Sequence, residues 1–331
     1  MEFINRYQRD FPLCEAPFAR IAAAHGHTEQ QVLQAYREAL ATGALSRLGG
    51  VFHQSAGGAS TLAAMAVPAD RLQAVARQVS AEPGVNHNYE REHRFNLWFV
   101  IAAQSQDLLD QALDRLALAT DLPIMALPMV RPYRIDLAFD LNGATASHPR
   151  GGSRPPSRGI DQDEYALAAH VEEGLPILAR PFDVWAEALG WPVASVLARI
   201  QQWLDAGILR RFGNVVRHHE FGFQANAMTV FAVPAAQIDA LGCALAEQPE
   251  VTLSYQRATA AGWPYNLYCM VHGRDRETVR NTIAAIVHRC GLKAYPCEIL
   301  FSLQRFKQEG GRRFRPTAPR TTPLGADHVL V

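Results

Sequence analysis

The chain has 331 residues, of which 48% are hydrophobic, and its 32 lysine and arginine residues balance 32 aspartate and glutamate residues. This length and apolar content predict more than one folded domain and a sizeable core. The formal charge of zero excludes a global basic field of the kind that attracts nucleic acid, so any anion-binding site must be local.

The cysteines and the first residues indicate where the protein works. Five cysteines, odd in number and without CxxC spacing, argue against a disulfide framework and against a zinc site. The opening sequence MEFINRYQRD lacks the apolar segment of a signal peptide, and no run of about 18 uncharged apolar residues follows it. We therefore expect a cytoplasmic protein without a membrane span.

Two halves of the sequence repeat one another. Gly43 falls on Gly207, an offset of 164 residues, and at this offset Pro17 falls on Pro181 and Arg47 on Arg211. The match resumes in the stretches VNHNYER and VTLSYQR, which start at residues 85 and 251. This repetition predicts two homologous units fused in one chain.

Each half opens with a predicted winged helix-turn-helix unit, over residues 1–50 and 161–214. In the second unit, apolar residues recur every three or four positions, as expected of an amphipathic helix. These residues are Val196, Leu197, Ile200, Trp203 and Leu204. A wing should follow each of the two helix pairs.

The remainder of each half, residues 51–141 and 215–308, shows strands and helices in the order βαββαβ, which is typical of a ferredoxin-like sandwich. A segment rich in Gly, Pro, Ser and Arg, residues 142–160, predicts a flexible linker, and residues 309–331 a disordered tail. The fold class is α+β, and we expect the two halves to pair as a pseudo-dimer that could dimerise further.

This architecture resembles that of the Lrp/AsnC transcription regulators, so a DNA-binding function has to be considered. A reading helix normally supplies several cations for phosphates. The second helix of each predicted unit offers only one, Arg37 in the first half and Arg199 in the second. We therefore expect no specific DNA binding.

The stretch RRFGNVVRHHEFGF, residues 210–223, concentrates cations directly after the second helix-turn-helix. Arg210, Arg211, Arg217, His218 and His219 are separated by small and apolar residues. Solvated positions at the end of a strand are the alternative interpretation, above all for Arg210. Arg211 has a counterpart in the first half, Arg47, which favours a functional role for this position.

This stretch, together with VTLSYQR, GWPYNLYCMVHG, GGVFHQSAGGAS and VNHNYEREHRFNLWFV, resembles the sirohaem decarboxylases, which are Lrp-like proteins. The tandem arrangement is similar to the fused members of haem d1 biosynthesis. The resemblance implies the conversion of sirohaem to 12,18-didecarboxysirohaem, with no cofactor beyond the iron of the substrate. Because sirohaem carries eight carboxylates, cations should surround it.

The resemblance assigns two groups of residues to the substrate. In the second half these are Arg211, Arg217, Phe223, Asn226, Arg257, Trp263, Tyr265 and His272. In the first half they are Arg47, His53, His87 and Arg91. The arginines would hold carboxylates, and the aromatic residues of the second half would offer an apolar surface to the macrocycle.

His218 is the first candidate for the catalytic acid, and Tyr255 is the second. Axial ligation of the substrate iron is an alternative role for His218. The first half has Gln54 at the position of His218 and His53 at that of Arg217. The second half should therefore carry the main site, while a second site in the first half stays open. A regulator that senses a haem precursor and a non-catalytic tetrapyrrole carrier are the alternative functions.

Overall fold

The computed structural model describes residues 2–135, 158–216 and 225–315. The first half contains α1 (Glu2–Arg6), α2 (Pro17–His25), α3 (Glu29–Ala41), β1 (Leu45–Phe52), η1 (Gln54–Ala56), β2 (Ala59–Met65), α4 (Leu72–Ala81), β3 (Val85–Arg91), β4 (Leu97–Ala103), α5 (Gln106–Thr120) and β5 (Met125–Ile135). The second half contains η2 (Gln162–Glu164), α6 (Tyr165–Glu173), α7 (Pro181–Leu189), α8 (Val193–Asp205), β6 (Leu209–Val216), β7 (Ala225–Phe231), α9 (Ile238–Ala246), β8 (Val251–Arg257), β9 (Leu267–Gly273), α10 (Arg276–Arg289), η4 (Leu292–Ala294) and β10 (Cys297–Gln308). Corresponding elements follow the predicted repeat.

The helix-turn-helix units form where the sequence predicts them. Gly26 and Gly190 end α2 and α7 in the left-handed region, with φ of 69° and 66°, a conformation that glycine adopts without strain. Thr28 then caps α3, because its hydroxyl accepts from the Gln31 amide at 3.3 Å while the Gln31 side chain accepts from the Thr28 amide at 2.9 Å. Both units are built on the same turn between their two helices.

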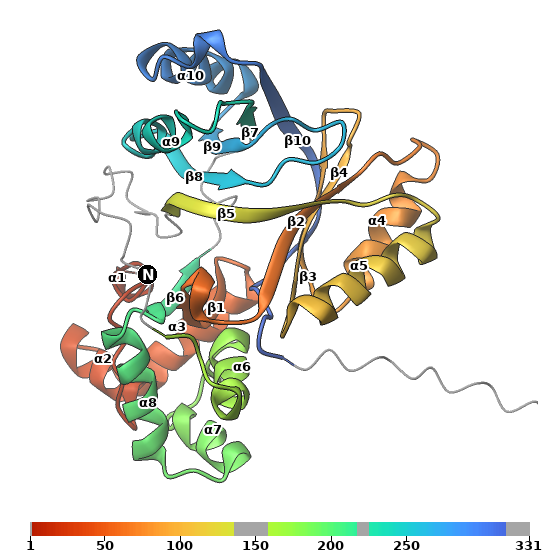
Figure 1. The fold of residues 1–331 in the computed structure, drawn as a ribbon. Coiled ribbons are helices and arrows are strands. Elements are labelled where there is room, and N and C mark those ends of the chain that lie inside the picture. Colours follow the sequence, from red (N-terminus) through yellow and green to blue (C-terminus); the bar gives the residue numbers. More distant parts are fainter. Residues whose placement is uncertain (1, 136–157, 217–224, 316–331) are drawn as a thin grey trace, which may run out of the picture.

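The strand after each helix pair does not fold into a separate hairpin wing. Instead β1 and β6 pair with each other as a two-stranded antiparallel sheet, with Gly49 opposite Gly213. One hydrophobic core lies around this sheet and contains residues of both halves, including Phe18, Phe182 and Trp203. The two helix-turn-helix units are thus one layer, which Figure 1 shows below the larger sheet.

Each half also forms the predicted ferredoxin-like sheet, and the two sheets close into an eight-stranded barrel. The strand order is β10-β3-β4-β2-β5-β8-β9-β7, with β7 joined back to β10. The closure depends on the last strand of each half, because β5 continues along β8 and β10 continues along β3. The halves therefore form the expected pseudo-dimer within one chain.

Three apolar clusters fill this part of the molecule. One lies inside the barrel and includes Leu62, Trp98, Tyr255 and Tyr268. The second lies under α4 and α5, and the third under α9 and α10, so that each sheet is covered by its own pair of helices (Figure 1). The barrel interior is shared between the halves, whereas the buried residues of each helix-covered cluster come from one half, with Tyr133 and Phe306 of the other half packed at the margins.

The disordered tail was predicted to begin at residue 309, but the chain is still packed against the protein up to residue 315. After β10, residues 309–315 cross to the helix-turn-helix layer, where Phe314 is 0% exposed. Its ring packs edge-on against Phe52 and Tyr165, at centroid distances of 5.0 and 5.1 Å. We call residues 309–315 the C-terminal strap. Its run of Gly and Arg suggested disorder, but one buried aromatic ring fixes it to the core.

Candidate functional site at the junction of the two layers

The cation cluster begins on β6, and its first part is not an open surface. Arg211 is 8% exposed, and its Nη1 donates to the backbone carbonyls of Gln8 at 2.7 Å and Asn214 at 2.9 Å. Both acceptors belong to the helix-turn-helix layer. Arg217, His218, His219 and Phe223 lie outside the described residues, so their proposed roles stay predictions.

Arg91 and Arg257, predicted to bind carboxylates, instead connect the two halves. Arg91 Nη1 on β3 donates to the Leu300 carbonyl on β10 at 2.9 Å, and Arg257 Nη1 on β8 donates to the Leu127 carbonyl on β5 at 2.7 Å. Each of these two residues is 7% exposed. Burial lowers the pKa of Arg91 to about 10. This geometry favours a structural role at the seams of the barrel.

Tyr255 also lies inside the barrel. Its ring stacks on Tyr268 at a centroid distance of 5.5 Å, and the Arg257 guanidinium lies 4.7 Å from the Tyr255 ring centroid. With an exposure of 6%, Tyr255 is part of the packed interior. This placement favours packing over the predicted proton donation to substrate.

Asn226 and His272 lie opposite each other on neighbouring strands, β7 and β9. The Ser302 hydroxyl donates to Asn226 Oδ1 at 2.6 Å, and His272 Nδ1 lies 3.2 Å from the Thr252 hydroxyl. Asn226 is at the start of the strand that follows residues 217–224. The structure thus brings these two predicted residues together, next to the segment that contains His218.

Trp263 does not present an open flat surface, whereas the neighbouring Tyr265 is half-buried. Trp263 is 1% exposed and contacts the rings of His93, Phe95 and Trp98, at centroid distances of 5.3, 5.8 and 5.2 Å. Its indole N–H donates to the Tyr268 hydroxyl at 2.7 Å. Trp263 therefore closes the barrel interior. A sequence does not show whether an aromatic residue of a turn such as GWP faces a ligand or its own core.

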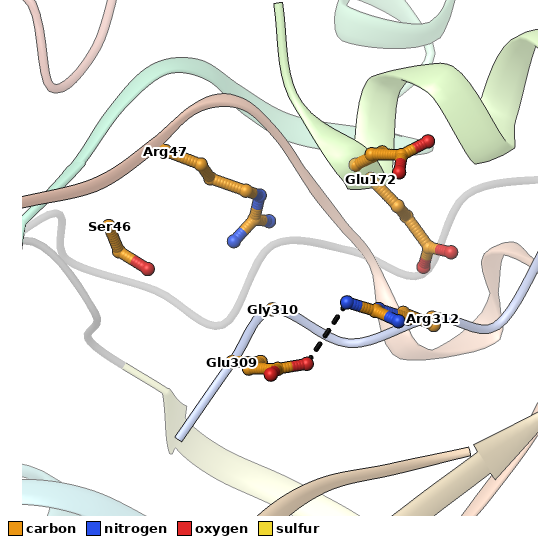
Figure 2. Close-up of a pocket in the computed structure, with 7 residues that line it drawn as sticks. Ser46, Arg47, Glu172, Glu309, Gly310 and Arg312 are labelled. Atoms are coloured by element: carbon orange, nitrogen blue, oxygen red, sulfur yellow. Dashed lines mark hydrogen bonds and ion pairs between the residues drawn. The ribbon is translucent and has the colours of Figure 1, made fainter. Parts of the chain in front are cut away.

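A cavity of about 150 Å³ lies between the helix-turn-helix layer and the strap (Figure 2). Its lining residues are Ser46, Arg47, Glu172, Glu173, Glu309, Gly310 and Arg312. Arg47 extends from β1 and donates from Nη2 to the Gly50 carbonyl at 2.8 Å. Its Nε is buried without a hydrogen-bond partner. Of all the predicted site residues, only Arg47 is in the lining of this cavity.

His53 and His87 lie near the same junction. The His53 carbonyl accepts from Arg313 of the strap at 3.1 Å, and His87 pairs with Gln308, the last residue of β10. Burial and the nearby Arg210 and Arg313 lower the pKa of His53. Burial and Arg47 lower that of His87 to about 4. Both imidazoles are therefore expected to be neutral at pH 7, in a region dominated by arginine charge.

Glu172 was not predicted as a site residue, yet it is 6% exposed at the end of α6. Its carboxylate accepts from the Phe314 amide at 2.9 Å and lies 3.7 Å from Arg313 Nε. Burial raises its pKa to about 7, although Arg313, the Phe314 amide and Arg47 act in the opposite direction. A signal was present, because Glu172 falls on the apolar stripe of α6 with Leu167, Ala168 and Val171.

Two features are absent from the described residues. They contain no group of three or more His, Cys, Asp and Glu side chains placed to hold a metal ion. No helix among them is long and apolar enough to cross a bilayer. The junction offers buried guanidinium groups and neutral imidazoles, a combination suited to organic anions.

Two family models match the chain. An AsnC-like ligand-binding domain matches residues 55–134 and 220–307, and a sirohaem decarboxylase NirDL-like HTH domain matches residues 2–45 and 165–210. The matched regions lie in both halves. Phe223 lies within the AsnC-like match, whereas Arg47 and residues 211–219 lie between the matched regions.

Comparison with individual proteins covers nearly the whole chain. The sirohaem decarboxylase NirDL subunit of Paracoccus denitrificans is 39% identical over 94% of this chain and 95% of its own length. The NirD subunit of Pseudomonas aeruginosa is 49% identical over 43% of this chain and 94% of its own length. A crystal structure of sirohaem decarboxylase NirDL with an iron-uroporphyrin III analogue superimposes with a TM-score of 0.69 at 27% identity, covering 96% of this chain and 95% of that one. The chain belongs to the sirohaem decarboxylase NirDL family.

Proposed function

We propose that this protein is a carboxy-lyase that removes two acetate carboxyl groups from sirohaem as carbon dioxide and forms 12,18-didecarboxysirohaem. The observation that carries the proposal is the 39% identity with a sirohaem decarboxylase NirDL subunit over 94% of the chain. The likeness to a NirDL structure that holds an iron-uroporphyrin III analogue supports an iron tetrapyrrole as the substrate. The iron belongs to this substrate, and we propose no further cofactor.

Electrostatics favours such a ligand at the junction of the layers. Sirohaem carries eight carboxylates, and an anion of this charge needs several cations around it. Residues 305–315 contain five basic side chains and one acidic one, and the neighbouring β6 adds Arg210 and Arg211. We propose that substrate contacts come from this region and from residues 217–224, which join β6 to β7.

The reaction needs a group that accepts the electron pair of the broken carbon–carbon bond, and it needs a proton. When the bond between the acetate methylene and its carboxyl group breaks, carbon dioxide leaves and the electron pair moves into the adjoining pyrrole ring. A proton must be available to that ring or to the methylene, which becomes a methyl group. We propose His218 as the donor, because an imidazole exchanges protons near neutral pH. Ligation of the substrate iron is its alternative role.

The arginines should bind carboxylates that remain on the product. A tight ion pair with the departing carboxylate would stabilise the ground state as much as the transition state and would not accelerate the reaction. Loss of water around that one carboxylate would favour its departure. We therefore propose that Arg217, and any free donor of Arg210, bind carboxylates that remain on the product.

An anaerobic incubation of the purified protein with sirohaem tests the proposal. Mass spectrometry should detect successive losses of about 44 mass units, the mass of carbon dioxide, as expected if an acid of the protein promotes both steps. Stoichiometric binding without any loss of mass would favour the carrier function instead. Sequence-specific DNA binding that responds to the tetrapyrrole would favour the regulator.

A further inference from the structure

We infer that the Arg47 cavity is a binding subsite for a single carboxylate arm of the tetrapyrrole, separate from the cation cluster after β6. The inference rests on the proposed function for the identity of the ligand. It goes further because it assigns one cavity and one cation to a single carboxylate arm, acetate or propionate. Figure 2 shows Arg47 reaching from β1 toward the strap, with Gly310 beside its guanidinium group.

The carboxylates that line the cavity pair with other groups, so the Arg47 guanidinium is available to bind a ligand anion. Glu309 pairs with Arg312 at 3.0 Å, Glu173 pairs with Arg315 at 3.5 Å, and Glu172 accepts from the Phe314 amide and faces Arg313. All three acids of the cavity thus have partners on the strap. Among the described residues, Arg47 has no carboxylate within salt-bridge distance, and its Nε–H is buried without an acceptor. The Nε of Arg91 and of Arg257 is also buried without a partner, but of the three residues only Arg47 is in the lining of this cavity. A buried unpaired donor beside a cavity favours a bound anion.

The size of the cavity selects an arm rather than a macrocycle. Its volume of about 150 Å³ is well below the roughly 300–1,000 Å³ of sites that enclose whole small molecules. An acetate or propionate group with a few waters would fit. Glu173 and Glu309, on the rim, are exposed, so the cavity opens to solvent on that side. The macrocycle would lie outside and extend one arm inward.

The repeat makes this subsite a property of the first half. At the repeat offset, Arg47 corresponds to Arg211 and Gly50 to Asn214, and the Arg47–Gly50 hydrogen bond has its counterpart in Arg211–Asn214. Glu172 corresponds to Gln8, whose carbonyl takes up a further donor of Arg211. Arg47 has no such second acceptor. The same position is therefore committed to the backbone in one half and faces a cavity in the other.

Gly310 provides a direct test, because a Cβ atom there would lie 2.5 Å from Arg47 Nη1. Gly310→Ala should displace the flexible end of Arg47 without a backbone clash. Gly311→Ala is the matched control, since a Cβ at that position meets no atom within 4 Å. Arg47→Met removes the charge, and Arg47→Lys retains it. Thermal unfolding of each variant reports whether the fold is intact.

Binding of iron uroporphyrin III, which has four acetates and four propionates, is measured by absorption titration. We expect roughly 10- to 100-fold weaker binding for Gly310→Ala and Arg47→Met, a smaller loss for Arg47→Lys and none for Gly311→Ala, as for a lost charge-assisted hydrogen bond. Iron coproporphyrin III, which lacks the acetates, identifies the arm. Equal weakening of both ligands assigns a propionate, and an effect on uroporphyrin alone assigns an acetate.

Unchanged uroporphyrin affinity in folded Gly310→Ala and Arg47→Met would overturn the subsite, even if the wild-type protein decarboxylates sirohaem. If Arg47→Met does not fold, Gly310→Ala decides alone. If instead the wild type removes no carbon dioxide but its uroporphyrin binding depends on Arg47, the proposed function fails and the subsite stands. The two hypotheses therefore fail separately.

Discussion

At the scale of single residues, Glu172 couples the fold to pH. Its folded pKa of about 7 is raised from an ordinary 4.5, so the folded protein retains a proton that the unfolded chain releases between these values. The contribution of this raised pKa to the free energy of unfolding is therefore fully present below about pH 4.5, and it is lost as the pH rises through about 7 and Glu172 ionises in the folded protein. The shift corresponds to at most roughly 3 kcal/mol.

Replacing Glu172 with Gln should remove this pH dependence, because the amide oxygen can still accept from the Phe314 N–H but does not ionise. Relative to wild type, Glu172→Gln should become progressively more stable between pH 5 and pH 8, as measured by urea unfolding. Glu173→Gln is the control, since Glu173 is exposed at the same helix end. A constant difference between Glu172→Gln and wild type across this range would contradict the assignment.

His218 and Gln54 occupy equivalent positions of the repeat, and only the first can donate a proton as an acid. His218→Ala should lower the rate of carbon dioxide release by roughly a hundredfold, the usual scale for a lost general acid. Gln54→Ala should have little effect, and equal losses would indicate two working sites. If His218 ligates the iron, its removal should also change the absorption spectrum of bound sirohaem, and added imidazole should partly restore that spectrum.

The residue types at the site were easier to predict than their surroundings. Arg47 and Arg211 stood out because both halves retain them, yet the sequence does not show that Gln8 satisfies one while a cavity faces the other. Arg91 and Arg257 looked like ligand cations for the same reason. Their acceptors are the backbone carbonyls of Leu300 and Leu127 in the opposite half. Every residue has such a carbonyl, so the sequence does not show which one accepts a hydrogen bond from an arginine.

At the scale of elements, the C-terminal strap fastens the barrel to the helix-turn-helix layer. The Phe314 amide donates to Glu172 on α6, and its carbonyl accepts from Gln104 after β4 at 2.7 Å. Phe314→Ala should lower the free energy of unfolding by roughly 3–5 kcal/mol, because it empties a fully buried ring site. Arg315→Ala, which removes an exposed ion pair, should cost less than about 1 kcal/mol. Denaturant unfolding at one pH compares the two, and similar small losses would show that the ring does not anchor the strap.

The helices α3 and α8 occupy the positions of reading helices but lack free cations. Arg37 donates to the Ile177 carbonyl at 3.1 Å, and Arg199 forms an ion pair with the buried Glu164. The strands that follow both helices are used in the β1–β6 pair. We therefore predict no sequence-specific duplex binding at physiological salt, where phosphate contacts normally supply much of the affinity. Fluorescence anisotropy with promoter duplexes measures this, and a nanomolar, sequence-dependent affinity would contradict it.

At the scale of the whole molecule, the repeat revealed the elements but not how the halves close. Periodicity shows which face of a strand is apolar, and this was enough to predict βαββαβ twice. It does not show which edge strand of one sheet pairs with which edge strand of the other. The pairing of β5 with β8 and of β10 with β3 was therefore not predictable. The linker prediction, residues 142–160, falls largely outside the described residues, although Ile160 at its end is buried.

The shared barrel leads to a prediction about dividing the chain. The interior cluster takes Leu62, Trp98 and Leu127 from the first half and Met228, Tyr255 and Tyr268 from the second. Either half alone would expose its part of this cluster and the edge of its last strand, which favours aggregation. The P. aeruginosa NirD subunit, which matches 43% of this chain, shows that a protein of half this length occurs as a separate subunit.

Fragments 1–145 and 146–331, separated within the Gly- and Pro-rich segment, should therefore copurify when they are coexpressed. Each fragment alone should be insoluble or should pair with itself through the vacant strand edge. Size-exclusion chromatography with light scattering distinguishes these states. Because the two fragments together contain all eight strands of the described barrel, the reconstituted pair should also bind iron uroporphyrin III with nearly the affinity of the intact chain. A folded, monomeric fragment in isolation would show that the barrel seams are not needed to complete either half.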